Sequence, residues 1–229
     1  MMKKDAAPET TTLSLTVPAS VSDQLQLQHQ RKWQQTAVLV SHPSLQIDFL
    51  ITDCPDKNHL DDYSEVLRSH RVSDLFRICE PSAYLTTSLE ASGISVHEMY
   101  FDDGTPPTSD VVKTFRSLIS NMVQTSASTT PQTYSKSSLL SIPPMKPVAA
   151  VHCVSGIGRA PVLVCCALVD GGVDPVDAVE YIRKRRRGAI NKIQLAWILD
   201  ERKGFKRTSS VLKRKDSLSF LKGIFSKRQ

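Results

Sequence analysis

The chain has 229 residues, 40% of them hydrophobic, which suffices for one domain with tails and an ordinary buried core. No apolar run approaches the roughly 18 residues needed to cross a bilayer, and no apolar segment follows the two N-terminal lysines, so we expect neither a transmembrane helix nor a signal peptide. The net charge is +6, but residues 201–229 hold ten Lys or Arg and two acidic residues, which leaves a slightly acidic body without the basic surface typical of nucleic-acid binding.

The N-terminal half alternates strand and helix patterns. Residues 1–34 are polar, rich in Thr, Ser and Gln, and we expect them to be disordered. Beyond them, short apolar runs predict strands and 3.6-residue periods predict helices. The predicted order is strand TAVLVS, strand IDFLITD, helix NHLDDYSEVLRSHRV, strand DLFRICE, strand SVHEMYF and helix SDVVKTFRSLISNMV.

The C-terminal half begins with residues 124–142, whose many Ser and Thr residues predict a mobile insertion. The apolar run KPVAAVHC then predicts a buried central strand. Three helices are predicted after it, in APVLVCCALVDGG, in DPVDAVEYIRKRRRG with Asp174 as N-cap, and in NKIQLAWILDERKG. Strands that alternate with helices predict an α/β fold.

The segment VHCVSGIGRA, residues 151–160, joins the predicted central strand to the next helix. A loop at that position can present backbone N–H groups to an anion, and its two glycines let the backbone curl. The residues expected to hold the anion are Val154, Ser155, Gly156, Ile157 and Gly158. The pattern predicts a phosphate-binding loop; the alternative is an ordinary glycine turn beside a structural cysteine.

Cys153 and Arg159 supply the chemistry of this loop. The planar guanidinium of Arg159 can bind two oxygens of a tetrahedral dianion. Helix N-termini and nearby cations stabilise a thiolate, so Cys153 is expected to be an activated nucleophile toward phosphorus. His152 either orients the loop or helps to stabilise the thiolate. This chemistry needs no metal and no cofactor.

Four segments resemble one family of cysteine-dependent protein phosphatases, a superfamily with the signature HCx5R. VHCVSGIGRAPVLV, FDDGTPP, DAVEYIRKRRRGAIN and QLAWI are similar to the phosphatase of regenerating liver family, the type IVA tyrosine phosphatases, and the likeness runs from about residue 36 to 205. The resemblance implies a dual-specificity-type phosphatase fold, with a central mixed, mainly parallel sheet flanked by helices. We expect this domain at residues 35–205.

The segment FDDGTPP is the candidate acid loop, because the oxygen that leaves phosphorus needs a proton. By resemblance, Asp103 is the general acid and Asp102 its neighbour. Without the cysteine loop, adjacent Asp residues before Gly would be more typical of a turn. The family has Trp-Pro-Phe before the pair, whereas this chain has Met99, Tyr100 and Phe101, which calls into question how the acid loop packs.

Ala160 predicts slow turnover. Many phosphatases of the superfamily have Ser or Thr after the arginine, where the hydroxyl helps the thiolate to leave; the resembled family has Ala. Loss of one hydrogen bond to a charged group costs roughly 1.5–3 kcal/mol, or about 10- to 100-fold in that step. We therefore expect a phosphocysteine intermediate to accumulate. Ser155 replaces the family's usual Ala and either contacts phosphate or faces solvent.

The chain has five cysteines, an odd number without a signal peptide, which indicates a reducing compartment such as the cytoplasm. By resemblance, Cys79 matches the family's second cysteine, which can form a disulfide with the catalytic one; the alternative is a buried free thiol. Cys165 and Cys166 are expected in the core, and Cys54 is assigned no role.

The leading functional hypothesis is a phosphatase that hydrolyses phosphate monoesters, foremost protein phosphotyrosine, with phosphoserine and phosphoinositides left open. The alternative, implied by the resemblance, is a regulator that binds cyclin M-type magnesium transport proteins through the catalytic cleft. A rhodanese-like sulfur carrier also uses a cysteine loop with an arginine, but FDDGTPP would have no role in it.

The basic tail, residues 206–229, is expected either to contact an anionic membrane surface or to stay solvated. Its apolar residues fall on one face of a helix; they are Val211, Leu218, Leu221 and Phe225. Family members usually end in a prenylation box, and this sequence has no cysteine after Cys166. We therefore expect a cytoplasmic protein, peripheral at membranes if the tail binds them.

Overall fold

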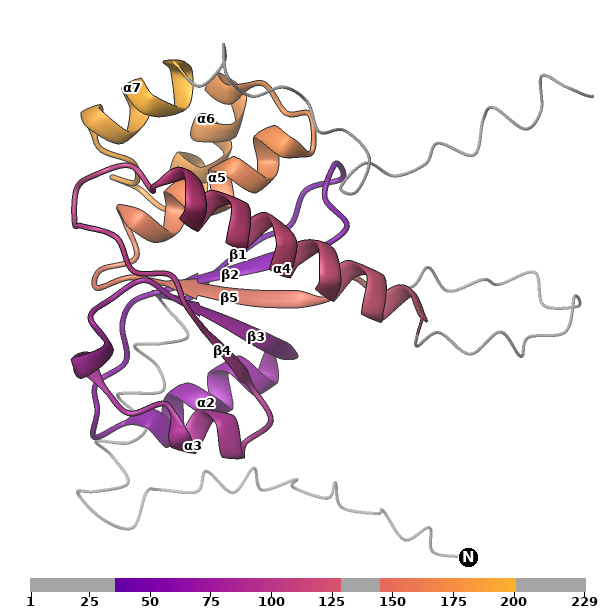
Figure 1. The fold of residues 1–229 in the computed structure, drawn as a ribbon, viewed down its shortest axis with the longest axis vertical. Coiled ribbons are helices and arrows are strands. Elements are labelled where there is room, and N and C mark those ends of the chain that lie inside the picture. The colour runs from indigo at the N-terminus through magenta and orange to yellow at the C-terminus, as the bar shows by residue number, and fades with distance from the viewer. Residues whose placement is uncertain (1–35, 129–144, 201–229) are drawn as a thin grey trace, which may run out of the picture.

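The computed structural model of the chain describes residues 36–128 and 145–200 (Figure 1). Five strands within these ranges form one sheet in the order β1-β2-β5-β3-β4. The strands are β1 (Val38–Val40), β2 (Asp48–Thr52), β3 (Val72–Arg77), β4 (Ser95–Glu98) and β5 (Val148–His152). β1 is antiparallel to β2 and all other neighbours are parallel, so the predicted mixed, mainly parallel sheet is confirmed.

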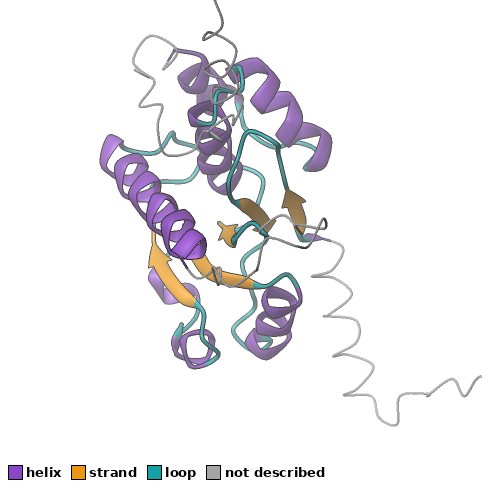
Figure 2. Ribbon diagram, turned by 90° about the vertical axis from the view of Figure 1, so that its right-hand side faces the viewer, coloured by secondary structure: helices purple, strands orange, loops and turns teal. Residues whose placement is uncertain are grey.

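Helices cover both faces of the sheet (Figure 1, Figure 2). One face carries α2 (Leu60–Ser69) and α3 (Thr87–Ala91). The other side carries α4 (Ser109–Ser128), α5 (Arg159–Asp170), α6 (Pro175–Arg185) and α7 (Lys192–Asp200). Each side has its own apolar core, and all five residues of β5 are buried between the two. The prediction of a buried central strand is therefore confirmed.

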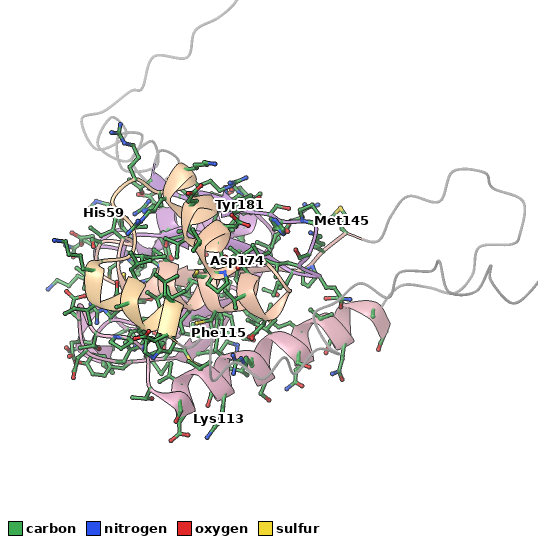
Figure 3. All side chains as sticks on the ribbon, turned by 90° about the horizontal axis from the view of Figure 1, so that it is seen from above. His59, Lys113, Phe115, Met145, Asp174 and Tyr181 are labelled. Carbon is green, nitrogen blue, oxygen red and sulfur yellow. The ribbon has the colours of Figure 1, made fainter. Side chains whose placement is uncertain are left out.

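Local sequence explains where the helices begin and which faces they bury. The side chain of Asp174 accepts a hydrogen bond from the Val176 N–H at 2.9 Å, so the expected N-cap of α6 is confirmed. In α4, Phe115 packs between Phe49 and Phe76 of the sheet. Figure 3 shows Phe115 turned inward while Lys113 of the same helix points away. α5 is apolar on nearly every side because other helices and the sheet surround it.

Two features differ from the sequence-based expectation. The 3-10 helix η1 (Pro81–Ala83) and α3 lie in a stretch for which no element was predicted. α4 continues to Ser128, so the first residues of the expected insertion at 124–142 are helical. Polar side chains bond back onto that helix end, as Ser128 Oγ does to the Gln124 carbonyl at 3.0 Å.

The expected N-terminal segment 1–34, the rest of the insertion and the tail 206–229 lie outside the described residues. Among the residues that the structure describes, no helix has both the length and the apolar character that crossing a membrane requires.

Candidate active site

The predicted phosphate loop lies at the carboxyl end of β5, where the central strand leads into α5. Parallel strands commonly place binding sites at this edge of a sheet. Cys153 is buried at the base of the loop, whereas Val154 and Ile157 are exposed on its rim. Gly156 has a φ of +63°, in the left-handed region that favours glycine. Any Cβ at Gly156 would lie only 2.6 Å from the Thr52 carbonyl oxygen, so both the conformation and the space require glycine.

Four consecutive carbonyls of the loop accept hydrogen bonds from outside it. The Val154 carbonyl accepts from the Cys54 N–H at 2.9 Å, and the Ile157 carbonyl from the Ile190 N–H at 2.8 Å. Arg186 donates to the other two, at 2.9 Å to Ser155 and 3.1 Å to Gly156. The N–H of a trans peptide points opposite to its C=O. The following four N–H groups therefore turn toward the inside of the loop, which is the arrangement that binds an anion.

Arg159 begins α5 and is buried against the loop. One terminal nitrogen of its guanidinium donates to the carbonyls of Ile78 at 3.0 Å and Phe101 at 3.2 Å. The buried Nε has no hydrogen-bond acceptor among the described residues. Its neighbour is a carboxylate oxygen of Asp103 at 3.1 Å, an ion pair in which the N–H does not point at the oxygen. One terminal nitrogen thus holds the guanidinium in place through two hydrogen bonds. The Nε–H can still donate to an oxygen of a ligand.

The acid loop is held by residues that follow α6. Asn191 donates to the Gly104 carbonyl at 2.9 Å, and the fully buried Gln194 donates to the Thr105 carbonyl at 3.1 Å. The side chain of Asp103 stays 79% exposed while it pairs with Arg159, which places a carboxylate at the mouth of the site.

The three residues before the acid pair take separate positions. Met99 is buried in the core, and Phe101 is buried with its carbonyl bound to Arg159. Tyr100 is exposed, and its hydroxyl lies 3.4 Å from a carboxylate oxygen of Asp102. Asp102 therefore faces Tyr100, whereas Asp103 faces Arg159. Met99 and Phe101 anchor the loop in the core even though the family's Trp and Pro are replaced.

His152 is fully buried behind the nucleophile, at the end of β5. Burial lowers the pKa of His152 to about 4, so the ring is neutral near pH 7. Its Nδ1 lies 3.0 Å from the Cys153 carbonyl, which can only accept, so Nδ1 carries the proton. Nε2 then accepts from the Tyr84 hydroxyl at 2.6 Å. A neutral imidazole adds no positive charge beside Cys153, which favours the orienting role.

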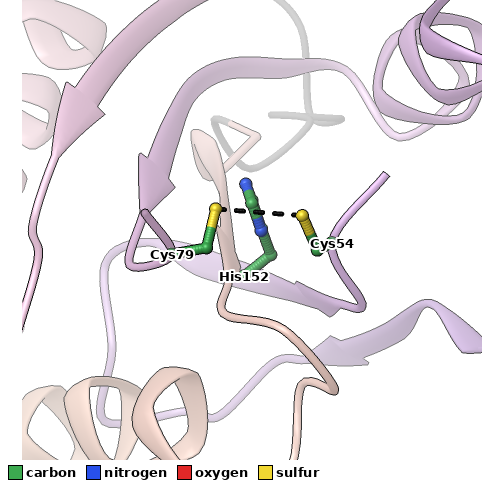
Figure 4. Close-up of side chains that lie close together, drawn as sticks. All are labelled: Cys54, Cys79 and His152. Carbon is green, nitrogen blue, oxygen red and sulfur yellow. Dashed lines mark hydrogen bonds between the residues drawn. The ribbon is translucent and has the colours of Figure 1, made fainter. Parts of the chain in front are cut away.

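The structure places the predicted redox residue, Cys79, two residues after the end of β3 and buries it. Its sulfur accepts a hydrogen bond from the Cys54 thiol at 3.8 Å (Figure 4). No disulfide joins any of the five cysteines, all of which lie in the described residues, and pairing of Cys79 with Cys153 stays a prediction. Cys165 and Cys166 are buried in α5, as predicted.

The sequence predicted no role in the active site for Gln194, Asn191, Arg186, Tyr84 or Cys54. Arg186 and Asn191 lie in RKRRRGAIN, and Gln194 lies in QLAWI, two segments that resemble the family. The resemblance does not tell which residues their side chains contact. Nothing local to Tyr84 or Cys54 signals a role, because their partners are distant in the sequence.

No protein-family model matches the chain. A type IVA protein tyrosine phosphatase of Dictyostelium discoideum is 41% identical over 150 residues, which make up 66% of this chain and 79% of that protein. The human protein tyrosine phosphatase type IVA 3 is 39% identical over 150 residues, 66% of this chain and 76% of its own length.

A solved protein tyrosine phosphatase from Leishmania major has a TM-score of 0.60 and 38% identity, and covers 71% of this chain and 96% of its own. The similarity in sequence agrees with the described geometry: a cysteine loop at the end of the central strand, with a buried arginine and a carboxylate facing it. The chain belongs to the phosphatase of regenerating liver family, the type IVA protein tyrosine phosphatases.

Proposed function

We propose that the chain hydrolyses phosphate monoesters, foremost those of protein phosphotyrosine, through a slowly hydrolysed phosphocysteine at Cys153. The observation that carries this proposal is the set of four outward-bonded loop carbonyls, which turns the next N–H groups inward, beside an Arg159 Nε that pairs with Asp103 but has no hydrogen-bond acceptor among the described residues. Together they form a cradle for three phosphate oxygens above the Cys153 sulfur. The same cradle suits phosphoserine or a phosphoinositide headgroup, which differ in the leaving group.

In the first step, the Cys153 thiolate attacks phosphorus, an S–P bond forms, and the bond to the leaving oxygen breaks. The loop N–H groups and Arg159 hold the non-bridging oxygens and stabilise the charge on them. Asp103 gives its proton to the leaving oxygen. In the second step, water attacks phosphorus, Asp103 takes up the proton of the water, and the S–P bond breaks to restore the thiolate.

Rapid-quench kinetics on an aryl phosphate test the proposal. The wild-type chain should show a burst of about one phenolate per chain, followed by slow steady turnover. Cys153→Ser should abolish the burst, and Arg159→Lys should nearly abolish it because a point charge cannot replace the planar fork. Cys165→Ser, a buried cysteine in α5, is the matched control and should keep the burst. Full activity of Cys153→Ser would overturn the mechanism.

The alternative role, binding of a cyclin M-type transport protein, stays a proposal that the resemblance implies. The cradle supports it in one respect, since inward N–H groups and a guanidinium also suit a carboxylate from an acidic loop. If it operates, such a partner should compete with phosphate analogues such as vanadate for the wild-type site. Binding that vanadate leaves unchanged would place the partner elsewhere.

A further inference from the structure

Three side chains with ligand or redox chemistry meet beneath the phosphate loop. Cys54 follows β2, Cys79 follows β3, and His152 ends β5, which lies between those two strands. Their reactive atoms lie within 4.8 Å of one another, and Figure 4 shows the direct contact between the two sulfurs beside His152. The proposed mechanism uses neither cysteine.

The arrangement favours thiol chemistry over metal binding. A metal ion held by all three residues would need a free nitrogen of His152. Its Nδ1 donates to the Cys153 carbonyl and its Nε2 accepts from Tyr84, so both nitrogens are occupied. The sulfurs of Cys54 and Cys79 remain, 3.8 Å apart. A disulfide bond is about 2.05 Å long, so closing this gap takes a movement of less than about 2 Å.

The two cysteines differ in access. Cys79 is almost completely buried, whereas Cys54 is half-buried in the turn after β2 and is the sulfur that a small oxidant reaches first. The hydrogen bond that Cys54 donates lowers the pKa of the Cys79 thiol, and the same bond together with burial raises the pKa of the Cys54 thiol. Cys54 is therefore the first sulfur oxidised because peroxide can reach it, whereas Cys79 has the greater thiolate character. Cys79 is therefore suited to attack an oxidised neighbour.

We propose that Cys54 and Cys79 form a disulfide when hydrogen peroxide oxidises the chain, and that this second redox pair competes with Cys153 for Cys79. Cys54 first breaks the O–O bond of peroxide and becomes a sulfenic acid, with release of one water. Cys79 then attacks the Cys54 sulfur; an S–S bond forms, the S–O bond breaks, and the hydroxyl leaves as a second water with the thiol proton. Peroxide is reduced by two electrons and the two thiols are oxidised by two.

The pair is also connected to the active site through the backbone. The Cys54 N–H supports the phosphate loop through the Val154 carbonyl. Next to Cys79, Ile78 donates to the His152 carbonyl at 2.9 Å and accepts from Arg159 at 3.0 Å. A disulfide between Cys54 and Cys79 would therefore cross-link two segments that hold the nucleophile loop and its arginine.

The decisive experiment uses the 229-residue chain with Cys153→Ser, in which four cysteines remain and the rival partner of Cys79 is removed. After mild peroxide, catalase and alkylation, peptide mapping by mass spectrometry should find a Cys54–Cys79 linked peptide and a loss of two free thiols per chain. Adding Cys54→Ser should abolish the loss, whereas adding Cys165→Ser should leave it unchanged. The result does not depend on phosphatase activity.

Several outcomes would overturn the proposal. Cys54 and Cys79 could both be alkylated after peroxide, or Cys54 could be found as a sulfinic acid with Cys79 free. Thiols that resist peroxide until a chelator is added would instead indicate a metal site. In the chain that retains Cys153, peroxide should give a larger fraction of Cys79–Cys153 disulfide when Cys54 is replaced by Ser. An equal fraction would rule out the competition.

Discussion

His152 shows how one buried side chain links the fold to its stability. The ring lies between Tyr63 and Tyr84 and has a hydrogen bond on each nitrogen. Protonation would place a charge on a fully buried ring and would force the Tyr84 hydroxyl to change from donor to acceptor. A histidine at this position is compatible with the fold only while it is uncharged.

Acid should therefore destabilise the protein through His152. Between pH 6.5 and about 4 the unfolded chain binds the proton and the folded chain does not, so stability is lost as pH falls across this window. The loss is about 1.4 kcal/mol per pH unit and roughly 3 kcal/mol in total. Urea unfolding at pH 7.5, 6 and 5 measures it. His152→Asn should flatten this dependence relative to the control His70→Asn; equal slopes in both variants would contradict the assignment.

Ala160 offers no hydroxyl to the thiolate that leaves phosphorus in the second step. Its methyl group is fully buried in the first turn of α5, directly after Arg159. Ala160→Ser adds a donor that can stabilise the departing thiolate, so the steady-state rate should rise about 10-fold while the burst shrinks. Rapid-quench kinetics measure both quantities. Ala167→Ser, a buried alanine later in α5, is the control. An unchanged rate would mean that another step limits turnover.

Residues that follow α6 hold the phosphate loop and the acid loop in place through hydrogen bonds. Arg186 binds two carbonyls of the phosphate loop and forms an ion pair with Asp53, while Asn191 and Gln194 hold the acid loop. A single stretch of chain therefore sets the distance between nucleophile and acid. Gly156 contributes to this arrangement, because a residue without a Cβ leaves room for the Arg186 side chain.

Gly156→Ala should distort the loop far more than Gly188→Ala. Both glycines have a positive φ, so both substitutions carry the same conformational cost of about 1 kcal/mol. At Gly156 the new Cβ would also clash, because it would lie 2.5 Å from the Arg186 side chain and 2.6 Å from the Thr52 carbonyl oxygen. At Gly188 no atom lies within 4 Å of the new Cβ. Burst kinetics should show a loss of at least about 100-fold for Gly156→Ala and less than about 10-fold for Gly188→Ala. Similar losses would refute the steric argument.

Gln194→Met should act through the position of Asp103. It removes the hydrogen bond to the Thr105 carbonyl and the one that the side-chain oxygen accepts from the Asn191 N–H, and it keeps the side-chain volume. Because kcat/KM reports formation of the phosphocysteine, its loss should grow as the leaving group becomes more basic and depends more on the acid. Gln124→Met, an exposed glutamine on α4, is the control. A loss that is equal for all leaving groups would indicate a merely structural role.

The sequence predicted the elements whose signals are local. β5 is a continuous apolar run and α6 has an Asp-Pro start, and both were found as expected. α3 has only five residues, too few to show a helical period. The catalytic loop was recognisable because its residues are contiguous. The contacts of Gln194 with Thr105 and of Cys54 with Cys79 depend on the folded sheet, which no local pattern specifies.

Positive charge is concentrated in the C-terminal part of the chain. Residues 206–229 contain eight Lys or Arg and one Asp, although the net charge of all 229 residues is only +6. The remaining residues are therefore close to neutral, and attraction to an anionic surface would come mainly from the tail. The tail lies outside the described residues, and its charge is known from the sequence.

The tail should bind anionic membranes and release them in salt. Each Lys or Arg near an anionic leaflet contributes roughly 1 kcal/mol before losses, and Val211, Leu218, Leu221 and Phe225 can add a shallow apolar face. Sedimentation with phosphatidylserine vesicles should capture the full chain, and a truncation after Phe205 should stay in solution. Phosphatidylcholine vesicles are the control for surface charge, and raised salt should release the full chain because it screens the attraction. Equal binding of both chains, or binding that salt does not change, would exclude the tail as an electrostatic membrane anchor.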